Sequence, residues 1–386
     1  MKIVSVLTSG TAGGAEFASQ GLLDAMAERG HETVQLTDVP VLAGDWRTRV
    51  KPISLGPKLS RRTYPRIAAT FPLLAMRLRT ALVREQPYDV LLVHFKKEQL
   101  LVPYLPRSLR PMVVWAEWGP VPHLMRSGPT GRAYASAGRR ADLIVAVSDG
   151  TRESVCDAGV DGSKVAVLPN AVRADEVRFL PEARQRVRAE LGIPEGAPVV
   201  GCLSRLHPKK RNDVIIEAVK ALGTDVHLII AGDGEHEATL RALAAPLGER
   251  AHFIPTPGGR AAEVLSAFDV SAFGPSPTEG QPLAVVLSML TERPCVATAA
   301  EGVGDLIDDC VGGICSPEND PTALAALIAE HLEDGRGGDA GRRGRERAAA
   351  RFDSAVVAER FEELIAAAGT AAIDRVPPPA GAAGSR

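Results

Sequence analysis

Glycines, cations and a single carboxylate mark three short segments in which a ligand could be bound. The first segment, SGTAGGAEF, places Gly10, Gly13 and Gly14 between an aliphatic run and a helical pattern. Glycine allows backbone N–H groups to approach a ligand closely, and a helix N-terminus attracts anions. The spacing is not GxGxxG and no P-loop lysine follows. This turn by itself is therefore a weak signal for a phosphate site.

The second segment, SRLHPKKR, directly follows the aliphatic run VVGCL. It places Arg205 and Lys210 at the end of an expected strand, and two cations facing one ligand suit a diphosphate. A solvated loop is the alternative explanation for such a charge run. For an isolated charge run the solvated loop is the better explanation, and the position directly after an expected parallel strand narrows the difference between the two.

The third segment, PSPTEGQPLAVVLSML, places Glu279 directly before an expected helix. A carboxylate in this position accepts hydrogen bonds from hydroxyl groups. Backbone donors near the turn are those of Gly280, Gln281 and Leu283, which can bind sugar hydroxyls or a phosphate oxygen. The alternative is that Glu279 only stabilises the helix dipole, worth about 0.3 to 1 kcal/mol at an exposed N-terminus.

Short aliphatic runs alternate with amphipathic segments along the whole chain, and this alternation predicts an α/β fold with parallel sheets covered by helices. We expect strands in KIVSVLT, ETVQLT, YDVLLVHF, PMVVWAE, ADLIVAVS and KVAVLPN, and then in APVVGCLSRL, VHLIIAGDG, HFIPTP, DVSAFGPS and RPCVATA. Helices are expected in AEFASQGLLDAMAERG, NDVIIEAVKALG and residues 237–247. In such sheets ligands bind beyond the carboxyl ends of the strands, where all three segments lie.

The same kind of unit is built twice, so we expect two domains that face each other across a cleft. We place the N-terminal domain at residues 1–172, a charged connection at 173–196 and the C-terminal domain at 197–352. A C-terminal helix at 353–373 is expected to pack back on the N-terminal domain, and a disordered tail follows at 374–386.

The composition is that of an ordinary globular protein. The 386 residues carry 45 Lys and Arg against 47 Asp and Glu, so there is no electrostatic reason to expect a nucleic-acid partner. The five cysteines form no CxxC pair and no metal-type cluster, so we expect neither a disulfide nor zinc. We see no signal peptide and no long apolar run, which predicts a cytoplasmic protein.

One mostly apolar region is rich in basic residues. These are Lys51, Lys58, Arg61, Arg62, Arg66, Arg77, Arg79 and Arg84. Basic amphipathic segments can lie on anionic lipid. Because Pro72 interrupts the pattern, we expect a solvated helical face, with weak peripheral membrane contact as the alternative.

With these segments in order, the chain resembles the retaining family 4 glycosyltransferases, known as glycosyl transferases group 1. The likeness covers nearly the whole chain through TAGGAE, ADLIVAVS, VAVLPNAV, LSRLHPKKR, IAGDGEHEATLRAL, PSPTEGQPLAVVLSML and GVGDLIDDCVGGICSPENDPTAL. It implies the GT-B architecture, which has two Rossmann-like domains.

The resemblance also implies a metal-independent hexosyltransferase without a cofactor, whose substrate is a UDP- or GDP-sugar. Arg205 and Lys210 would hold the donor diphosphate with the backbone at Gly13 and Gly14, and Glu279 would face the donor sugar. Fixed cations stabilise the departing diphosphate, which itself takes the proton of the acceptor. The acceptor would be a hydroxyl of a sugar, an aminocyclitol, or a lipid-linked or glycan molecule. Family members serve secondary metabolism, antibiotic, polysaccharide and cell-envelope synthesis.

Two departures from the family matter. Leu287 stands where members carry a second glutamate that grips the ribose, and Trp118 stands where a histidine often lies near the donor sugar. His94, Glu117 and His123 are the other candidates for the acceptor or sugar side. The departures keep an alternative open, which is a catalytically impaired sugar- or nucleotide-binding protein that acts as a partner subunit.

Overall fold

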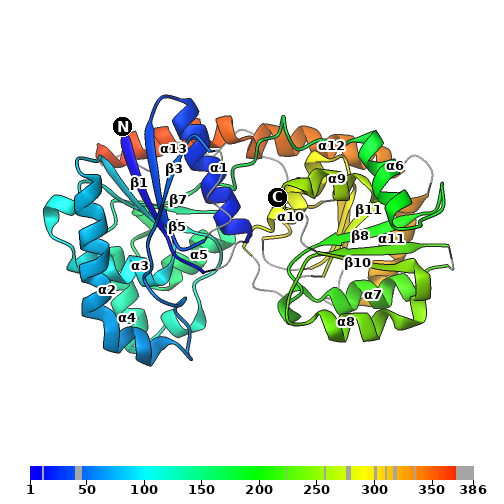
Figure 1. Ribbon diagram of the computed structural model, residues 1–386, viewed down its shortest axis with the longest axis horizontal. Coiled ribbons are helices and arrows are strands. Elements are labelled where there is room, and N and C mark those ends of the chain that lie inside the picture. Colours follow the sequence, from blue (N-terminus) through cyan, green and yellow to red (C-terminus); the bar gives the residue numbers. More distant parts are fainter. Residues whose placement is uncertain are drawn as a thin grey trace. The chain divides into compact units, whose positions relative to one another are not determined.

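The computed structural model describes residues 1–10, 13–39, 46–223, 225–255, 258–274, 280–299, 302–308, 311–315, 320–333 and 336–370. The chain divides into two compact units (Figure 1). Unit 1 is formed by Met1–Ala171 and the segment that begins at Ser354, and unit 2 is Val172–Asp353.

Unit 1 is built on a parallel sheet with the strand order β3-β2-β1-β4-β5-β6-β7. Its strands are β1 (Lys2–Leu7), β2 (Glu32–Thr37), β3 (Arg49–Pro52), β4 (Val90–Val93), β5 (Val113–Glu117), β6 (Leu143–Ala146) and β7 (Val165–Val167). Its helices are α1 (Gly14–Glu28), α2 (Tyr64–Glu85), α3 (Lys96–Leu101), α4 (Gly128–Gly138), α5 (Asp149–Asp157) and α13 (Ser354–Gly369). The strand order reverses between β1 and β4, which makes this pair the switch point where such sheets bind ligands.

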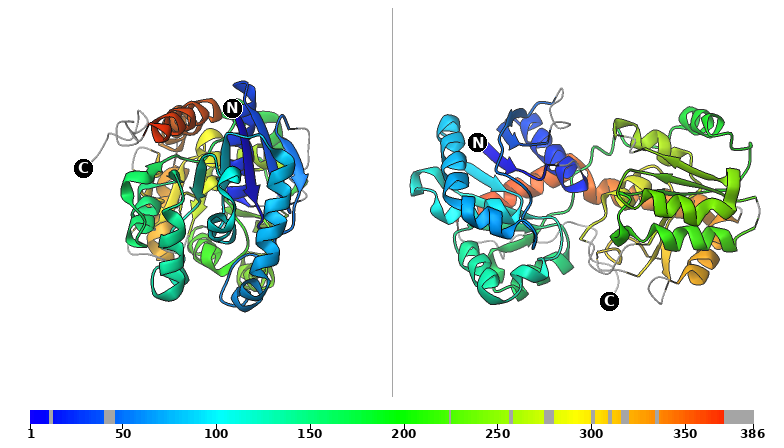
Figure 2. Two further views of the ribbon diagram at one scale, coloured as in Figure 1. Left: turned by 90° about the vertical axis from the view of Figure 1, so that its left-hand side faces the viewer. Right: turned by 60° about the horizontal axis from the view of Figure 1, so that its bottom comes forward.

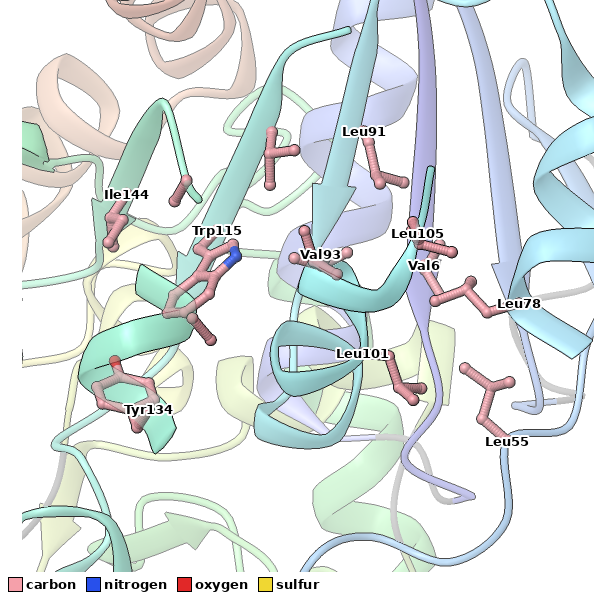
Figure 3. Packing of buried hydrophobic residues seen from close by; sticks show 14 of the residues in the cluster. Val6, Leu55, Leu78, Leu91, Val93, Leu101, Leu105, Trp115, Tyr134 and Ile144 are labelled. Carbon is pink, nitrogen blue, oxygen red and sulfur yellow. The ribbon is translucent and has the colours of Figure 1, made fainter. Parts of the chain in front are cut away.

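Alternation along the strands gives unit 1 two apolar layers. Val6 and Trp115 point to the face covered by α2, α3 and α4, where they share a cluster with Leu78 and Tyr134 (Figure 3). Ile3 points to the opposite face, which is covered by α1 and α13. Side chains of a strand alternate between its two faces, so both faces of a buried parallel strand must be apolar.

Unit 2 has a six-stranded parallel sheet with the order β10-β9-β8-β11-β12-β13. Its strands are β8 (Val199–Leu203), β9 (His227–Ala231), β10 (Ala251–Ile254), β11 (Val270–Phe273), β12 (Cys295–Thr298) and β13 (Gly312–Cys315). Its helices are α6 (Pro181–Glu190), α7 (Asn212–Ala221), α8 (Glu237–Ala244), α9 (Ala261–Ser266), α10 (Leu283–Leu290), α11 (Pro321–Leu332) and α12 (Arg336–Phe352). Helices cover both faces of each sheet (Figure 2). The switch point here lies between β8 and β11.

The predicted α/β class and the predicted strands are confirmed. The sequence did not predict β3 and β13, because RVKP and GGIC are four-residue segments with little apolar character. Helix α2 runs through Pro72 as one helix instead of breaking there. The stretch 173–196 contributes α6 to unit 2, and the tail at 374–386 lies outside the described residues.

Two further observations concern the described part of the chain. None of its helices combines the length and the hydropathy needed to cross a membrane. Cys156, Cys202, Cys295 and Cys315 are free thiols.

Candidate functional site

The loop after β8 carries the two predicted cations. Arg205 is exposed just beyond the strand end, and Lys210 is half-buried at the end of a short 3₁₀ helix. Arg211 then adopts a left-handed conformation with φ 46°, and α7 begins at the next residue. Because β8 borders the switch point of its sheet, the loop lies where parallel α/β sheets bind their ligands.

The loop after β9 holds the β8 loop in place through backbone contacts. Leu206 donates its N–H to the Asp233 carbonyl at 2.9 Å and accepts from the His236 N–H at 3.0 Å. A Cβ added at Gly234 would lie 2.1 Å from the Leu206 carbonyl oxygen. The glycine is therefore required by the close approach of two backbones, and the two hydrogen bonds of Leu206 hold the β8 loop there.

Polar side chains close the base of the β8 loop. Ser204 Oγ donates to Asn212 Oδ1 at 3.0 Å, and Cys202 Sγ lies 3.4 Å from the same oxygen. Burial raises the pKa of Cys202 to about 11, so the side chain remains a thiol near neutral pH. The end of β11 also reaches this loop, since a Cβ added at Gly274 would lie 2.7 Å from the Arg211 carbonyl oxygen.

Positive charge gathers around His207, a residue that the sequence analysis did not single out. The pKa of His207 is lowered, first by burial and then by the charge of Arg205. The charges of Lys209 and Lys210 also lower it, whereas the charge of Glu235 raises it. Nδ1 of His207 accepts from the Lys209 N–H at 3.1 Å. The ring thus caps the turn in its neutral form, and the charge offered to an anion comes from the neighbouring cations. The sequence feature that could have identified His207 is its position directly before Pro208, where a side chain can cap the turn.

The segment before α10 is described in part. Gly280, Gln281 and Pro282 are buried, and α10 begins at Leu283, so Pro282 is the residue that precedes the helix. Glu279 lies outside the described residues. Its role therefore stays a prediction.

Leu287, at the position where the resemblance implies a second glutamate, is a half-buried packing residue of α10. It contacts one hydrophobic cluster that includes Val285 and Met289, and a second that includes Leu265 and Phe268. The position is therefore partly integrated into the apolar core of unit 2.

In unit 1 the predicted glycines lie at the start of α1. Gly13 precedes the helix in an extended conformation, and no side chain caps the first turn. Gly10 has φ 74° and donates its N–H to Asp38 Oδ1 at 2.9 Å. Glu16 takes the space beside Gly13, because a Cβ added there would lie 3.1 Å from Glu16 Oε2. A larger residue at Gly13 would displace this carboxylate.

His94 closes β4 and is only 2% exposed. Its Nε2 lies 2.8 Å from Ser5 Oγ and 3.2 Å from Ser19 Oγ, while its Nδ1 accepts from Trp118 Nε1 at 3.2 Å. Burial lowers the pKa of His94 to about 3, so the ring is neutral. Because an indole N–H can only donate, Nδ1 carries no proton and Nε2–H donates to a serine hydroxyl.

Glu117 is also enclosed, with 3% exposure. It forms an ion pair with Lys96, accepts from Gln99 Nε2 at 3.0 Å and accepts from the Tyr134 hydroxyl at 2.8 Å. Burial lowers the pKa of Lys96, and the charge of Glu117 opposes this shift. The Glu117 carboxylate is therefore committed to contacts inside unit 1.

Trp118 and His123 are the more accessible members of the predicted acceptor side. Trp118 is half-buried beside a small apolar pocket, and His123 is exposed with no side-chain hydrogen bond to any described residue. The pocket is lined by Ala18, Leu22, Leu92, Ala116, Glu117, Trp118, Val145, Val147, Leu168, Pro169 and Ala171. The indole N–H of Trp118 is engaged by His94, and its ring also stacks on the His94 imidazole, with the ring centroids 5.7 Å apart.

The predicted residues fall into one group in each unit. Arg205 and Lys210 share the β8 loop of unit 2, whereas Gly13, His94 and Trp118 belong to unit 1. Over the described ranges, no three His, Cys, Asp or Glu side chains gather in a way that could hold a metal ion.

Family models match both halves of the chain, and known relatives match part of it. Residues 12–176 match Glycosyltransferase Family 4, and residues 197–334 match glycosyl transferases group 1. A GDP-mannose-dependent monoacylated alpha-(1-6)-phosphatidylinositol monomannoside mannosyltransferase of Corynebacterium glutamicum is 28% identical over 200 residues, 48% of this chain and 51% of that protein. A D-inositol 3-phosphate glycosyltransferase of Mycolicibacterium gilvum is 36% identical over 159 residues, 39% of this chain and 35% of that protein. The matches span about half or less of the length of these relatives.

Solved structures show the same fold. Anabaena HepE, in complex with UDP and glucose, has a TM-score of 0.82 at 21% identity, covering 95% of this chain and 100% of HepE. Sucrose-phosphate synthase from Thermosynechococcus elongatus has a TM-score of 0.80 at 18% identity, covering 96% of this chain and 100% of that chain. With both halves matched and two parallel-sheet units present, the chain belongs to the family 4 glycosyltransferases of the GT-B fold.

Proposed function

We propose that the protein transfers a sugar from a UDP- or GDP-sugar to a hydroxyl group of an acceptor. The observation that carries this proposal is the β8 loop, where Arg205 and Lys210 lie at a sheet switch point and the backbone of Leu206 is hydrogen-bonded to the loop after β9. Breaking the bond between the anomeric carbon and the diphosphate leaves negative charge on the diphosphate. Fixed cations and N–H groups stabilise that charge most strongly in the transition state.

The relatives narrow the substrates that we propose. One is named as GDP-mannose-dependent and acts on a phosphatidylinositol mannoside, and another is named as an inositol phosphate glycosyltransferase. They support GDP-mannose as the donor and an acceptor with an inositol or related cyclitol ring, free or lipid-linked. The UDP and glucose bound in HepE support a UDP-sugar as the other candidate donor.

We assign the steps as follows. Arg205 and Lys210 bind the diphosphate with the backbone of Gly13 and Gly14, and Glu279 orients the donor sugar. The acceptor oxygen attacks the face that the diphosphate leaves, so the anomeric configuration is retained, and the diphosphate takes the acceptor's proton. Neither a protein nucleophile nor a metal is needed. Because position 287 is a leucine and not a glutamate, the ribose lacks a hydrogen bond to a charged group, which would contribute about 1.5 to 3 kcal/mol to the binding free energy.

The test is incubation of the purified protein with GDP-mannose and with UDP-glucose, each with and without myo-inositol and with and without EDTA. We expect release of the nucleoside diphosphate that EDTA does not abolish, and an α-linked product by NMR. Tight donor binding without turnover would support the catalytically impaired binding protein instead. Loss of turnover in EDTA would contradict metal independence.

We further propose that unit 1 contacts anionic lipid through α2. The outward face of α2 exposes Tyr64, Leu73, Met76 and Val83 among Arg66, Arg77, Arg79 and Arg84. The helix has a single carboxylate, Glu85, which is buried and paired with Lys51 at 2.6 Å. Apolar side chains ringed by arginine suit a lipid surface, where the chains enter the boundary and the cations meet headgroups.

Vesicle co-sedimentation tests the lipid contact. We expect binding to phosphatidylcholine vesicles that contain phosphatidylglycerol, and its loss when Arg77 and Arg84 are both replaced by glutamate. Arg241→Glu on α8 of unit 2 is the control, because Arg241 is also exposed. Equal binding to vesicles of pure phosphatidylcholine would contradict a role of the arginines in binding anionic headgroups. No binding to either kind of vesicle would refute the proposal.

A further inference from the structure

The first turn of α3 carries charged residues that are almost entirely buried. Lys97 is 1% exposed and Glu98 is 0% exposed, although KKE on a short helix has the composition of a solvated face. Neither residue belongs to the sites assigned above. Burying a cation and a carboxylate is unfavourable unless each finds specific partners.

Their partners are on the loop that leads from β1 to α1. Oε1 of Glu98 accepts from the Thr8 N–H at 3.1 Å and from the Thr8 hydroxyl. Nζ of Lys97 lies 3.5 Å from the Thr8 carbonyl oxygen and donates to the Gly56 and Pro57 carbonyls at 2.6 Å and 3.2 Å. Every polar group of Thr8 is therefore held by one of two adjacent residues of α3.

A second contact holds the same loop two residues further on, where Gly10 donates its N–H to Asp38. The chain then reaches Gly13, at the start of α1. The segment Thr8–Gly10 is thus held by a carboxylate at each end, Glu98 at Thr8 and Asp38 at Gly10.

We propose that Lys97 and Glu98 are positioning residues for donor binding, which hold the segment Thr8–Gly10 so that the N–H groups of Gly13 and Gly14 meet the diphosphate. This inference rests on the proposed function for the identity of the ligand. The two residues do not contact the ligand themselves. They act through the hydrogen bonds of Thr8.

The contact also predicts a response to pH. Burial raises the pKa of Glu98 to about 7, while the Lys97 charge and the hydrogen bonds from Thr8 oppose the shift. Lys97 in turn is close to Asp38 and Lys58. As the pH falls below about 7, Glu98 becomes protonated and loses its charge. Its hydrogen bonds from Thr8 then join neutral groups, and such bonds are roughly half as strong as those to a carboxylate. The KM for the donor should therefore rise as the pH falls.

The test measures KM and kcat for hydrolysis of GDP-mannose and UDP-glucose over the neutral pH range with Glu98→Gln and Thr8→Val. Nucleotide sugars are suited because their diphosphate diesters do not titrate there. We expect each variant to raise KM about tenfold while kcat changes less than twofold, with the pH dependence of KM flattened in Glu98→Gln. Glu85→Gln is the matched control, since Glu85 is a 3% exposed carboxylate of the same unit that does not contact this loop. It should lower stability and leave KM unchanged.

Hydrogen–deuterium exchange of the ligand-free protein separates this inference from the proposed function. Amides of residues 8–10 should exchange faster in Glu98→Gln than in the wild-type protein and in Glu85→Gln. If the wild-type protein neither binds nor hydrolyses either donor, the proposed function fails, and faster exchange still supports the loop anchor. Unchanged exchange, or a donor KM equal to that of the wild-type protein, would overturn the inference.

Discussion

The indole of Trp118 donates a hydrogen bond to Nδ1 of His94 across 3.2 Å, and the two rings are nearly parallel, with an interplanar angle of 11°. Trp118 is the residue that departs from the family's histidine. The hydrogen bond fixes His94 in one tautomer, because an indole N–H can only donate, while burial keeps the ring neutral. Neither ring is arranged as a proton shuttle.

Nuclear magnetic resonance of ¹⁵N-labelled histidine should find His94 as the Nε2–H tautomer, with no titration between about pH 5 and 8, because its pKa is lowered to about 3 by burial. Trp118→Phe should reduce the free energy of unfolding by about 1 to 3 kcal/mol, since it leaves Nδ1 buried without a donor. Trp46→Phe is the control, because the Trp46 indole donates to no described residue. A His94 signal that titrates near pH 6.5 would contradict this assignment.

Arg205→Ala and Lys210→Ala should each reduce kcat/KM for the nucleotide sugar by about tenfold to a hundredfold, as expected for a lost charged hydrogen bond. The free energy of unfolding should change by less than about 0.5 kcal/mol for Arg205→Ala, because this side chain is exposed. Arg250→Ala serves as a control, a cation of the same unit that donates to the Val226 carbonyl. Parallel losses of stability and turnover at Arg205 would refute a binding role.

Leu287→Glu should increase the affinity for the nucleotide sugar by one to two orders of magnitude, about 1.5 to 3 kcal/mol, if the carboxylate reaches the ribose. It should also lower the free energy of unfolding by about 1 to 3 kcal/mol, because Leu287 contacts two apolar clusters. Leu287→Gln separates the two effects, since it loses the same packing without adding charge. Calorimetric titration that shows equal affinity for both variants would mean that the ribose pocket is differently built.

Glu362 of α13 accepts from Arg29 Nε and Nη2 at 2.8 and 2.6 Å, and it lies 2.6 Å from His31 Nε2. The hydrogen bond from Arg29 is the main cause that lowers the pKa of Glu362 to about 2. Its contribution to stability is therefore fully present above about pH 4.5 and is lost as the pH falls toward 2.

Glu362→Gln should thus be less stable than the wild-type protein at pH 7 by up to about 1 kcal/mol, the range for partly exposed pairs. The difference should shrink as the pH falls toward 2 and vanish below it, where the wild-type carboxyl is protonated as well. Denaturant unfolding at several pH values measures this, with Glu363→Gln, a 53% exposed neighbour, as the control. A difference that grows on acidification would contradict the assignment.

Much of the fold follows from local sequence pattern. The alternation in KIVSVL places Ile3 and Val6 on opposite faces of one strand, and the structure confirms a strand buried on both sides. The position of SRLHPKKR after VVGCL also placed Arg205 at a strand end, which is where it lies. Such features depend on residues close in sequence, whose periodicity reports directly which side is buried.

The contacts of buried polar residues could not be predicted from the local sequence. The sequence HFKKEQ offers no sign that Glu98 is buried against Thr8, a residue 90 positions away. Nor does it show that Glu117 is enclosed by Lys96 and Tyr134. The order β1-β4-β5 brings these segments together, and burial then decides which charges are paired and which pKa values shift. The sequence by itself therefore determined most of the elements and the positions of the loops at their ends, because these depend on local periodicity. The tertiary structure decided which of the charged residues are buried and paired and which remain accessible, because this depends on contacts between segments far apart in the chain.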